Sequence, residues 1–395
     1  MKKLVLAYSG GLDTSYCAKY LSKEENFEVH AVSVNTGGFS KEEIKSIGDK
    51  AVKLGATSYK SIDAVSIFYD KVVRYLIFGN VLKNNTYPLS VSAERIIQAI
   101  EIAKYAKEIG ADLIAHGSTG AGNDQVRFDM IFQILAPEIE IITPIRDNKL
   151  SRQTEIEYLK NEGIDLPWEK AKYSINKGLW GTSVGGEETL TSHLPLPEDA
   201  YPSQLKKTGT QDIKLSFDKG ELIAIDDQKD SCVNNIEKLD ELASKYAIGR
   251  DIHVGDTIIG IKGRVGFEAA APMIIIKAHH TLEKYVLTKW QQHHKEQMGN
   301  WYGMMLHEGH YLDEVMRNIE VFLVDTQKYV TGDVYVTLYP YRFTVNGINS
   351  IHDLMSSSFA SYGESNEGWT ADDAKGFIKI TSNQGKIFNH VNSLL

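Results

Sequence analysis

Short apolar runs alternate with helical patterns through the first 150 residues of the chain. In the longer stretches apolar side chains recur every three or four positions, as at Ile96, Ile97 and Ile100, which predicts amphipathic helices. The predicted strands are residues 4–8, 29–34, 58–62, 113–115 and 139–142, and the predicted helices are residues 14–21, 42–54 and 94–109. This alternation predicts an α/β fold with a doubly wound parallel sheet, covered by helices on both faces. Ligands bind such sheets beyond the carboxyl ends of the strands.

The pattern changes near residue 165. Residues 173–211 are rich in Gly, Ser, Thr and Pro, which predicts a long connection made mainly of loops. Strand and helix patterns then mix over residues 213–217, 236–246 and 273–277. We therefore predict three parts, namely an α/β domain at residues 1–165, an α+β domain at residues 166–364 and a C-terminal tail at residues 365–395.

Composition narrows the functional classes. The 395 residues include 43 lysines and arginines against 52 aspartates and glutamates, a net charge of −9. This balance argues against a nucleic-acid partner, which would need a basic face. Cys17 and Cys232, the two cysteines, lie far apart in the sequence. They exclude a disulfide framework, a four-cysteine zinc site and an iron–sulfur cluster, and they favour a reducing cytoplasm.

Neither a membrane span nor a secretory signal is predicted. No stretch approaches the roughly 20 apolar residues that a membrane span requires. The apolar run after Lys3 ends at Tyr8, whereas a signal needs about 7–15 apolar residues. We therefore predict a soluble cytoplasmic protein.

A glycine-rich turn follows the first predicted strand, with the sequence Ser9-Gly10-Gly11-Leu12-Asp13-Thr14-Ser15. Adjacent glycines let backbone N–H groups turn toward an anion, and the following helix adds unsatisfied N–H groups and a positive dipole end. This predicts a polyphosphate site, although a turn in which Asp13 or Thr14 only caps the helix would carry the same residues. The chain has no GxxxxGK[ST] motif, so ordinary NTPase chemistry is not expected.

A second polar segment, Gly117-Ser118-Thr119-Gly120-Ala121-Gly122-Asn123-Asp124-Gln125-Val126-Arg127-Phe128, follows the strand predicted at residues 113–115. It is therefore expected beside the phosphate loop at the same edge of the sheet. Thr119, Asn123, Asp124 and Arg127 offer a hydroxyl, an amide, an anion and a bidentate cation for an amino acid. Two alternatives stay open. Asp124 and Arg127 could simply pair with each other, or the glycines could form a dinucleotide loop, although their order does not fit GxGxxG.

These two segments resemble known signatures. Residues 7–15 resemble the pyrophosphatase loop of ligases that cleave ATP to AMP and pyrophosphate, and residues 117–128 resemble the second signature of the argininosuccinate synthase family. The resemblance is clear to about residue 150 and continues in fragments such as Leu179-Trp180-Gly181-Thr182-Ser183. It implies an N-terminal domain of the adenine-nucleotide α-hydrolase-like type, an oligomerisation role for the tail, a homotetramer and a place in arginine biosynthesis.

The resemblance also implies a reaction and its components. ATP is the co-substrate, Mg²⁺ accompanies it, and citrulline and aspartate are the amino-acid substrates. The ureido oxygen of citrulline attacks the α-phosphorus of ATP, and the amine of aspartate then displaces AMP to give argininosuccinate. Catalysis of this kind depends mainly on positioning and charge stabilisation, without a side-chain nucleophile.

Individual residues take roles from the resemblance. The ATP contacts would be Ala7, Tyr8, Ser9, Gly10, Gly11, Leu12, Asp13, Thr14, Ser15, Val34 and Gly117. Aspartate would be held by Thr119, Asn123 and Asp124, and the citrulline-like substrate by Tyr87, Ser92, Asn123, Arg127, Ser174 and Ser183. Asp13, Asp124 and Arg127 are the predicted catalytic residues, and no metal ligand from the protein is predicted. The alternative for Tyr87 is a loop aromatic packed on the sheet. Taken without the family, Ser174 and Ser183 would be ordinary loop serines.

The chain departs from the family pattern at four places. The family lysine before Gly-Asn-Asp is Ala121, and the segment after Tyr87 differs over residues 88–96. A Glu-Asn-Arg stretch becomes Gly255-Asp256-Thr257, and a tyrosine becomes Phe267. The lost glutamate and tyrosine belong to the amino-acid end of the citrulline site. Either Asp256 replaces the lost glutamate, or the site prefers an α-N-acylated citrulline such as N-succinylcitrulline, whose amide carries no charge.

Other functional classes fit less well. His307-Glu308-Gly309-His310 is one residue short of HExxH, so the histidines His279, His280, His293, His294, His307 and His310 are expected to be solvated or interface residues. An adenine-nucleotide-binding protein without ligase activity is the alternative class, because the phosphate loop alone would permit it. A glutamine-using synthetase or a tRNA-thiolating enzyme would need cysteines in a context that this chain does not offer.

Overall fold

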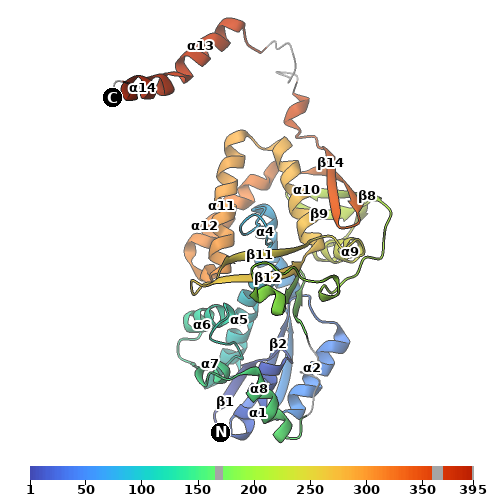
Figure 1. Cartoon of the computed structure of the whole chain (residues 1–395), viewed down its shortest axis with the longest axis vertical. Helices are drawn as coiled ribbons and strands as arrows, with labels where there is room; N and C mark the ends of the chain where they lie inside the picture. Colours follow the sequence, from blue (N-terminus) through green and yellow to red (C-terminus); the bar gives the residue numbers. More distant parts are fainter. Residues whose placement is uncertain (165–171, 358–367, 394–395) are drawn as a thin grey trace.

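The N-terminal part of the molecule is a five-stranded parallel sheet with helices on both faces (Figure 1). The computed structural model describes residues 1–164, 172–357 and 368–393. The strands lie in the order β3-β2-β1-β4-β5, and they are β1 (Lys3–Ala7), β2 (Glu28–Asn35), β3 (Ser58–Asp63), β4 (Leu113–Ala115) and β5 (Glu140–Ile142). Each predicted strand is confirmed to within about one residue at either end, and the predicted parallel α/β fold is confirmed.

Eight helices are described in this part. They are α1 (Leu12–Lys23), α2 (Lys41–Lys53), α3 (Val65–Phe68), α4 (Arg74–Phe78), α5 (Ser90–Glu108), α6 (Asp124–Leu135), α7 (Pro144–Asp147) and α8 (Arg152–Asn161), with a π-helical turn η1 (Tyr69–Val73) between α3 and α4. The three predicted helices are α1, α2 and α5. Helix α5 begins earlier than predicted, directly after Leu89, whose φ of 62° lies in the left-handed region. Its first turn carries Ser90 and Ser92, which the apolar periodicity did not include.

The sheet separates two apolar layers. Leu4 and Leu6 of β1 belong to the layer that contains α1 and α8, whereas Val5 and Ala7 belong to the layer that contains α5. Successive side chains of a strand point to opposite faces, so a sheet that is buried on both faces needs continuous apolar runs. The two layers fix the strand ends from which the loops of the site emerge.

The remaining described chain is α+β, as predicted, and contains two antiparallel sheets. One sheet has the order β11-β12-β7-β6 and consists of β6 (Ser174–Gly178), β7 (Gly181–Gly185), β11 (Arg250–Asp256) and β12 (Lys262–Glu268). The other has the order β10-β9-β8-β13-β14 and consists of β8 (Gln211–Asp218), β9 (Glu221–Ile225), β10 (Gln228–Lys229), β13 (Gly332–Tyr339) and β14 (Arg342–Asn349).

Helices pack against both of these sheets (Figure 1). Helices α9 (Cys232–Ser244) and α10 (Ala270–Val286) make these contacts, whereas α11 (Lys289–His307) and α12 (Glu314–Thr326) pack on each other and on α4, and α11 also on α5. Short 3₁₀ turns lie between the elements at η3 (Glu187–Leu190), η4 (Glu198–Ala200), η5 (His310–Leu312), η6 (Gln327–Tyr329) and η7 (Leu354–Ser356).

The prediction of a loop connection over residues 173–211 is wrong in its first half, which forms the hairpin of β6 and β7. Trp180 in the hairpin turn is fully buried, and its indole N–H donates to the Pro88 carbonyl at 3.0 Å. These strands are short and carry Gly, Ser and Asn, so neither alternation nor an apolar run marks them in the sequence. The predicted boundaries after residues 165 and 364 lie outside the described residues.

The C-terminal helices α13 (Ala371–Thr381) and α14 (Asn383–Asn392) extend away from the rest of the molecule (Figure 1). Their larger apolar side chains are between 56% and 72% exposed, namely Phe377, Ile378, Ile380, Ile387, Phe388 and Val391. Exposed apolar side chains that gather in this way indicate a contact surface. None of the described helices has the length and apolarity needed to cross a membrane.

The histidines of the 279–310 segment have different surroundings. His279 is fully buried, with Nδ1 at 2.6 Å from Asn80 Oδ1 and Nε2 at 2.8 Å from Gln327 Oε1. His293 is exposed on α11. In the described ranges no group of three or more His, Cys, Asp or Glu side chains has the arrangement of a metal site.

Candidate active site

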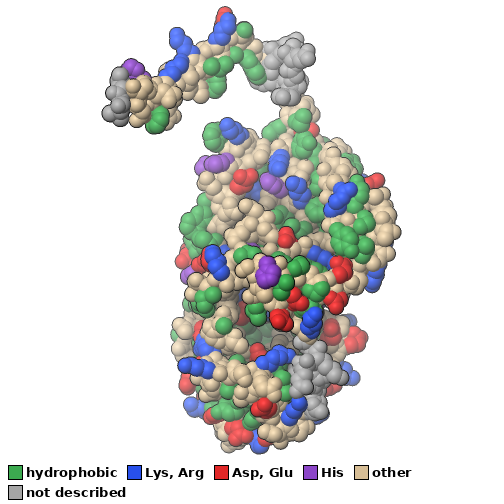
Figure 2. Space-filling model, viewed as in Figure 1, with side chains coloured by type: hydrophobic (Ala, Val, Ile, Leu, Met, Phe, Trp, Pro, Cys, Tyr) green, Lys and Arg blue, Asp and Glu red, His purple; other side chains and the backbone are tan. Residues whose placement is uncertain are grey.

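A cavity of about 1100 Å³ lies between the carboxyl ends of β1, β2 and β4 and the sheet formed by β6, β7, β11 and β12. Strand β1 lies between β2 and β4, so the cavity is at the point where the strand order reverses, the usual ligand position in this type of sheet. Figure 2 shows a hollow between the N-terminal part and the middle of the molecule, with charged side chains of both signs around it. The volume exceeds that of most single-ligand pockets.

The turn between β1 and α1 has the form that anion binding requires. Gly10 has a φ of 77°, a conformation that favours glycine. Ser9 Oγ accepts the Gly11 N–H at 3.4 Å and lies 3.2 Å from Thr14 Oγ1. Gly11 is the N-cap of α1, and no side chain caps the helix. The alternative in which Asp13 or Thr14 acts only as a cap is therefore wrong, and the first N–H groups of α1 can face a ligand.

Most of the residues predicted to contact ATP lie on the cavity wall. Ala7, Tyr8, Ser9, Gly11, Leu12, Asp13, Thr14, Val34 and Gly117 line it, whereas Gly10 and Ser15 do not. The same corner holds a cation that the sequence pattern did not reveal, Lys50 of α2. Its Nζ donates to the Gly10 carbonyl at 2.8 Å, across forty residues of sequence.

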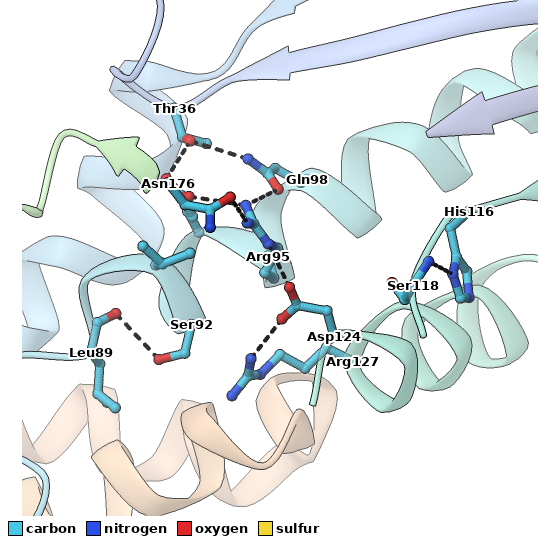
Figure 3. A network of polar contacts seen from close by, with 12 residues as sticks. Thr36, Leu89, Ser92, Arg95, Gln98, His116, Ser118, Asp124, Arg127 and Asn176 are labelled. Carbon is cyan, nitrogen blue, oxygen red and sulfur yellow. Dashed lines mark hydrogen bonds and ion pairs between the residues drawn. The ribbon is translucent and has the colours of Figure 1, made fainter. Parts of the chain in front are cut away.

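Asp124 lies between two arginines (Figure 3). Arg127 Nη1 donates to Oδ1 at 2.8 Å, and Arg95 Nε donates to Oδ2 at 3.0 Å. The other two donors of Arg127 reach the His307 carbonyl, at 2.9 and 2.8 Å. Burial alone would raise the pKa of Asp124, but the two guanidinium groups hold it below its usual range. The pairing of Asp124 with Arg127 that the sequence left open is present, and Arg95 extends it.

The carboxylate of Glu94, which is buried, also contacts Arg95. Arg95 Nη1 donates to Oε1 at 3.0 Å, and Thr36 Oγ1 donates to Oε2 at 2.8 Å. Burial raises the pKa of Glu94 to about 7 in spite of these two donors. A side chain on Gly178 of β6 would collide with the Glu94 carboxylate, so the close approach of β6 requires glycine there.

Arg95 connects three parts of the molecule. Besides its contacts on α5 and with Asp124 of α6, its Nη2 donates to Asn176 Oδ1 on β6 at 3.1 Å. Figure 3 shows the guanidinium group among Gln98, Asn176 and Asp124. Arg95 therefore links α5, α6 and β6 at the cavity wall.

The predicted substrate residues of the second part share one face of the antiparallel sheet. Phe267 of β12 lies opposite Ser183 of β7, and Ser183 lies opposite Asn176 of β6. Directly opposed residues point to the same face. Ser174, Ser183, His253 and Gly255 are therefore on the face toward the cavity, and all line it, as do Tyr87, Ser92, Thr119, Asn123, Asp124 and Arg127.

The departures from the family pattern are not all in the cavity. Gly255 lines it, and Phe267 packs on Tyr87 with ring centroids 5.4 Å apart. Glu94 belongs to the altered segment after Tyr87. Ala121 is exposed and is not part of the cavity wall.

Several cavity residues were not predicted from the sequence, namely Thr36, Lys50, Glu94, Arg95, His116, Arg152, His253 and His307. One signal was present, because Glu94 and Arg95 place two charges beside the apolar stripe of a predicted helix. His253 and His307 gave no such signal. They reach the cavity only through the packing of β11 and α11, which no local pattern encodes.

Two family models and several curated relatives match the chain over nearly its whole length. A model of the arginosuccinate synthase N-terminal HUP domain matches residues 3–165, and a model of the arginosuccinate synthase C-terminal domain matches residues 173–388. The argininosuccinate synthase of Methanocaldococcus jannaschii is 38% identical over 91% of each chain. That of Dictyoglomus turgidum is 36% identical over 98% of this chain and 97% of its own. That of Sulfurisphaera tokodaii is 35% identical over 96% of each.

Proposed function

The chain belongs to the argininosuccinate synthase family, and from this premise we propose that it joins a citrulline-type ureido acid to aspartate while ATP is cleaved to AMP and pyrophosphate. One observation carries the proposal: the loops after β1 and β4 open into the same cavity, with Arg95, Asp124 and Arg127 beside them. A ligase that activates one substrate with ATP and then joins it to another needs such a shared space.

The first step is adenylation of the ureido oxygen. This oxygen attacks the α-phosphorus of ATP, the bond from that phosphorus to the bridging oxygen breaks, and pyrophosphate leaves with the bonding electrons. The N–H groups of the Ser9–Gly11 turn, the hydroxyls of Ser9 and Thr14, and Lys50 stabilise the charge on the leaving group.

The second step forms the new C–N bond. The α-ammonium group of aspartate loses a proton to solvent, and the resulting amine attacks the ureido carbon. The bond from that carbon to the AMP oxygen breaks, AMP leaves with the bonding electrons, and the amine nitrogen loses a second proton to solvent as argininosuccinate forms. Thr119, Asn123 and Asp124 hold aspartate in this proposal. Asn123 Oδ1 accepts the Ile258 N–H at 2.8 Å, so the side-chain NH₂ group of Asn123 serves as the donor to an aspartate carboxylate. Asp124, kept ionised by two arginines, attracts the aspartate ammonium group.

The ureido substrate is held from both sides of the cavity. We assign this role to Tyr87, Ser92, Asn123, Arg127, Ser174 and Ser183, all of which line the cavity. Arg127 is 3% exposed and fixed by three hydrogen bonds, so it offers a charge of fixed position rather than a mobile one.

Mg²⁺ is part of the proposal because the carboxylate of Asp13 lies at the nucleotide end of the cavity. Burial and the neighbouring Asp13 raise the pKa of Glu155 to about 8, and Glu155 Oε2 is buried with no hydrogen-bond partner among the described residues. Glu155 does not line the cavity and is mainly protonated at pH 7, so Asp13 is the carboxylate that would face a cation whose other ligands are phosphate oxygens and water. Mg²⁺ held by ATP beside Asp13 would neutralise charge on the departing pyrophosphate.

We further infer a cytoplasmic homotetramer in which α13 and α14 contact neighbouring subunits. The exposed apolar side chains of these helices support this assembly, and the unpaired state of Cys17 and Cys232 supports the location. Light scattering should give a tetramer for the full chain and a smaller species for the double variant Phe377→Asp with Phe388→Asp. Lys379→Asp, on the same arm, should leave the tetramer intact. An unchanged mass in the double variant would contradict this role of the arm.

The proposed reaction is tested by its products. With ATP, Mg²⁺, aspartate and a ureido acid, AMP and pyrophosphate should form in equal amounts over many turnovers, and this sustained turnover should require both amino acids. Formation of ADP and phosphate would contradict the proposal. Pyrophosphate release that ignores both amino acids would instead favour a nucleotide-binding protein without ligase activity.

A further inference from the structure

Two buried imidazoles at the amino-acid end of the cavity have nitrogen atoms without partners. His253 of β11 and His307 at the end of α11 are each 6% exposed, and both line the cavity. Within the part of the chain that the structure describes, neither Nδ1 atom has a hydrogen-bond partner. Buried polar atoms are nearly always hydrogen-bonded. These two nitrogens therefore indicate a place where a polar ligand can bind and supply the hydrogen bonds that the protein does not.

The His253 ring occupies the space in front of Gly255. A Cβ on Gly255 would lie 2.7 Å from His253 Nε2 and 3.1 Å from Asn84 Nδ2, closer than such atoms pack. The ring is fixed in this position by stacking on Tyr87, with centroids 5.1 Å apart. Hence no acidic side chain can stand at position 255 while His253 keeps its place.

Asp256 does not replace the family glutamate whose position is occupied by Gly255. Its Oδ1 pairs with Lys262 Nζ at 2.6 Å, and its side chain is 64% exposed, so the charge is already neutralised at the surface although the residue borders the cavity. Adjacent residues of a strand point to opposite faces, which places the Asp256 side chain away from the face that carries Gly255.

The charges around the two imidazoles are mainly positive. Burial, Arg127 and Lys83 lower the pKa of His307 to about 2, and burial and Lys83 lower that of His253. Both rings are therefore neutral near pH 7, and each Nδ1 can donate or accept according to the tautomer. Asp124, the acidic group that also acts on His307, is shared by Arg95 and Arg127, and the proposed function assigns it to the aspartate substrate and not to the ureido acid. An ammonium group at this wall would face the cations Arg127 and Lys83. Among the described residues, no carboxylate at this wall is available to pair with it.

We propose that this wall is a subsite for an acylated α-nitrogen, so that the preferred ureido substrate is an α-N-acylated citrulline. This inference rests on the proposed function and names its substrate class. A secondary amide has one N–H donor and one carbonyl acceptor, which match two neutral imidazoles. It carries no charge that would need a counterion, whereas a free ammonium group would lose its hydration without gaining a partner. The expected selectivity for the amide is about 30-fold or more in kcat/KM.

The decisive experiment compares substrates on the unmodified full-length protein. Pyrophosphate release with ATP, Mg²⁺ and aspartate is measured for citrulline, α-N-acetylcitrulline and α-N-succinylcitrulline. Higher kcat/KM for either acylated compound supports the inference, and the two acyl arms show whether a terminal carboxylate adds to recognition. Equal or higher kcat/KM for citrulline overturns the inference and leaves the ligase proposal intact. No turnover with any of the three overturns the ligase proposal, and the inference with it.

Replacement of one imidazole tests which side chain recognises the amide. His253→Phe retains the stack on Tyr87 and the bulk in front of Gly255 but removes both ring nitrogens. It should lower kcat/KM for the acylated substrate about tenfold more than kcat/KM for citrulline, as expected for one lost hydrogen bond to the amide. The control His293→Phe changes an exposed histidine of α11 and should affect neither substrate. An equal decrease for both substrates would mean that His253 is only structural.

A second variant tests the role of the family glutamate whose position is occupied by Gly255. Gly255→Glu combined with His253→Ala removes the obstructing ring and restores an acidic side chain. The selectivity ratio should then shift toward free citrulline by about tenfold or more, because the ammonium group regains a partner. A ratio that does not move in this variant, with ATP binding intact as a check on folding, would overturn the assignment of this wall to the α-nitrogen.

Discussion

The two ends of the cavity are built in different ways. The nucleotide end is built mainly on one continuous segment, Ser9–Ser15, which follows a single strand and presents mainly backbone N–H groups, with Val34, Lys50 and Gly117 beside it. The amino-acid end is assembled from side chains of α5, α6, β6, β7, β11 and α11, with contacts such as that of Arg127 with His307 across 180 residues. A site made by the backbone tolerates the loss of one side chain, whereas a site made by interlocked side chains does not. We therefore expect substitutions at the amino-acid end to have the larger effects.

Arg127→Leu should cause the largest loss. Without the guanidinium group, Asp124 keeps only Arg95, and the His307 carbonyl loses both of its donors. The Asp124 side chain is 38% exposed, so solvent screens the charge left behind, and removal of the Arg127 guanidinium group should cost about 2–4 kcal/mol, the lower part of the range for buried charge pairs. Accordingly, kcat/KM for the ureido substrate should fall by between about 30-fold and several-hundred-fold. The Kd of ATP, measured by calorimetry, should stay near the value of the unmodified protein.

The matched control is Arg317→Leu. Arg317 donates to Glu320 three residues on at 2.6 Å, the same spacing as in the Arg127–Asp124 pair, but it lies on α12 and is not part of the cavity wall. This variant should lose some stability without a selective loss for the ureido substrate. If both variants lower activity equally, the effect reflects general destabilisation, and the contrast between the two ends is wrong.

The same contrast explains what could be predicted from the sequence. Ser9–Ser15 and Gly117 are encoded by a strand, a glycine-rich turn and a helix start in succession, so both the sheet and the phosphate corner were visible as local patterns. Ser174 and Ser183 were assigned through the family resemblance alone, because β6 and β7 have no strand-like pattern. His253 and Lys50 could not be found, since their positions depend on how distant elements pack and on which rotamers the packing leaves.

Glu94→Gln tests the junction between the two ends, because Glu94 contacts both Thr36 after β2 and Arg95. The pKa of Glu94 is raised from 4.5 to about 7 in the folded protein, so folding favours its neutral form. The stabilisation from neutral Glu94 is complete below about pH 4.5 and is lost as the pH rises through about 7. The unfolding free energy of the unmodified protein should therefore fall by up to about 3 kcal/mol between about pH 4.5 and pH 7. The unfolding free energy of Glu94→Gln should not show this decrease.

Urea unfolding of both proteins at about pH 5 and about pH 8 measures this difference. Glu108→Gln, at the exposed end of the same helix, is the control. Its carboxylate is 3.6 Å from Lys60 Nζ at the surface, so its pH dependence should match that of the unmodified protein. Parallel curves for Glu94→Gln and the unmodified protein would show that Glu94 does not titrate in this range.

Lys50→Met should have the smallest effect of the three, because it removes a side chain from an end that the backbone builds. Lys50 contacts the loop through the Gly10 carbonyl, and the N–H groups of the turn and of α1 remain in the variant. Loss of one charged hydrogen bond should raise the KM for ATP about tenfold and leave the KM for both amino acids unchanged. Lys53→Met, exposed on the same helix, should have no effect. If Lys50→Met abolishes ATP turnover to the extent expected for Arg127→Leu, the nucleotide end also depends on single side chains. The two ends of the cavity would then differ only in how far apart in the sequence their residues lie.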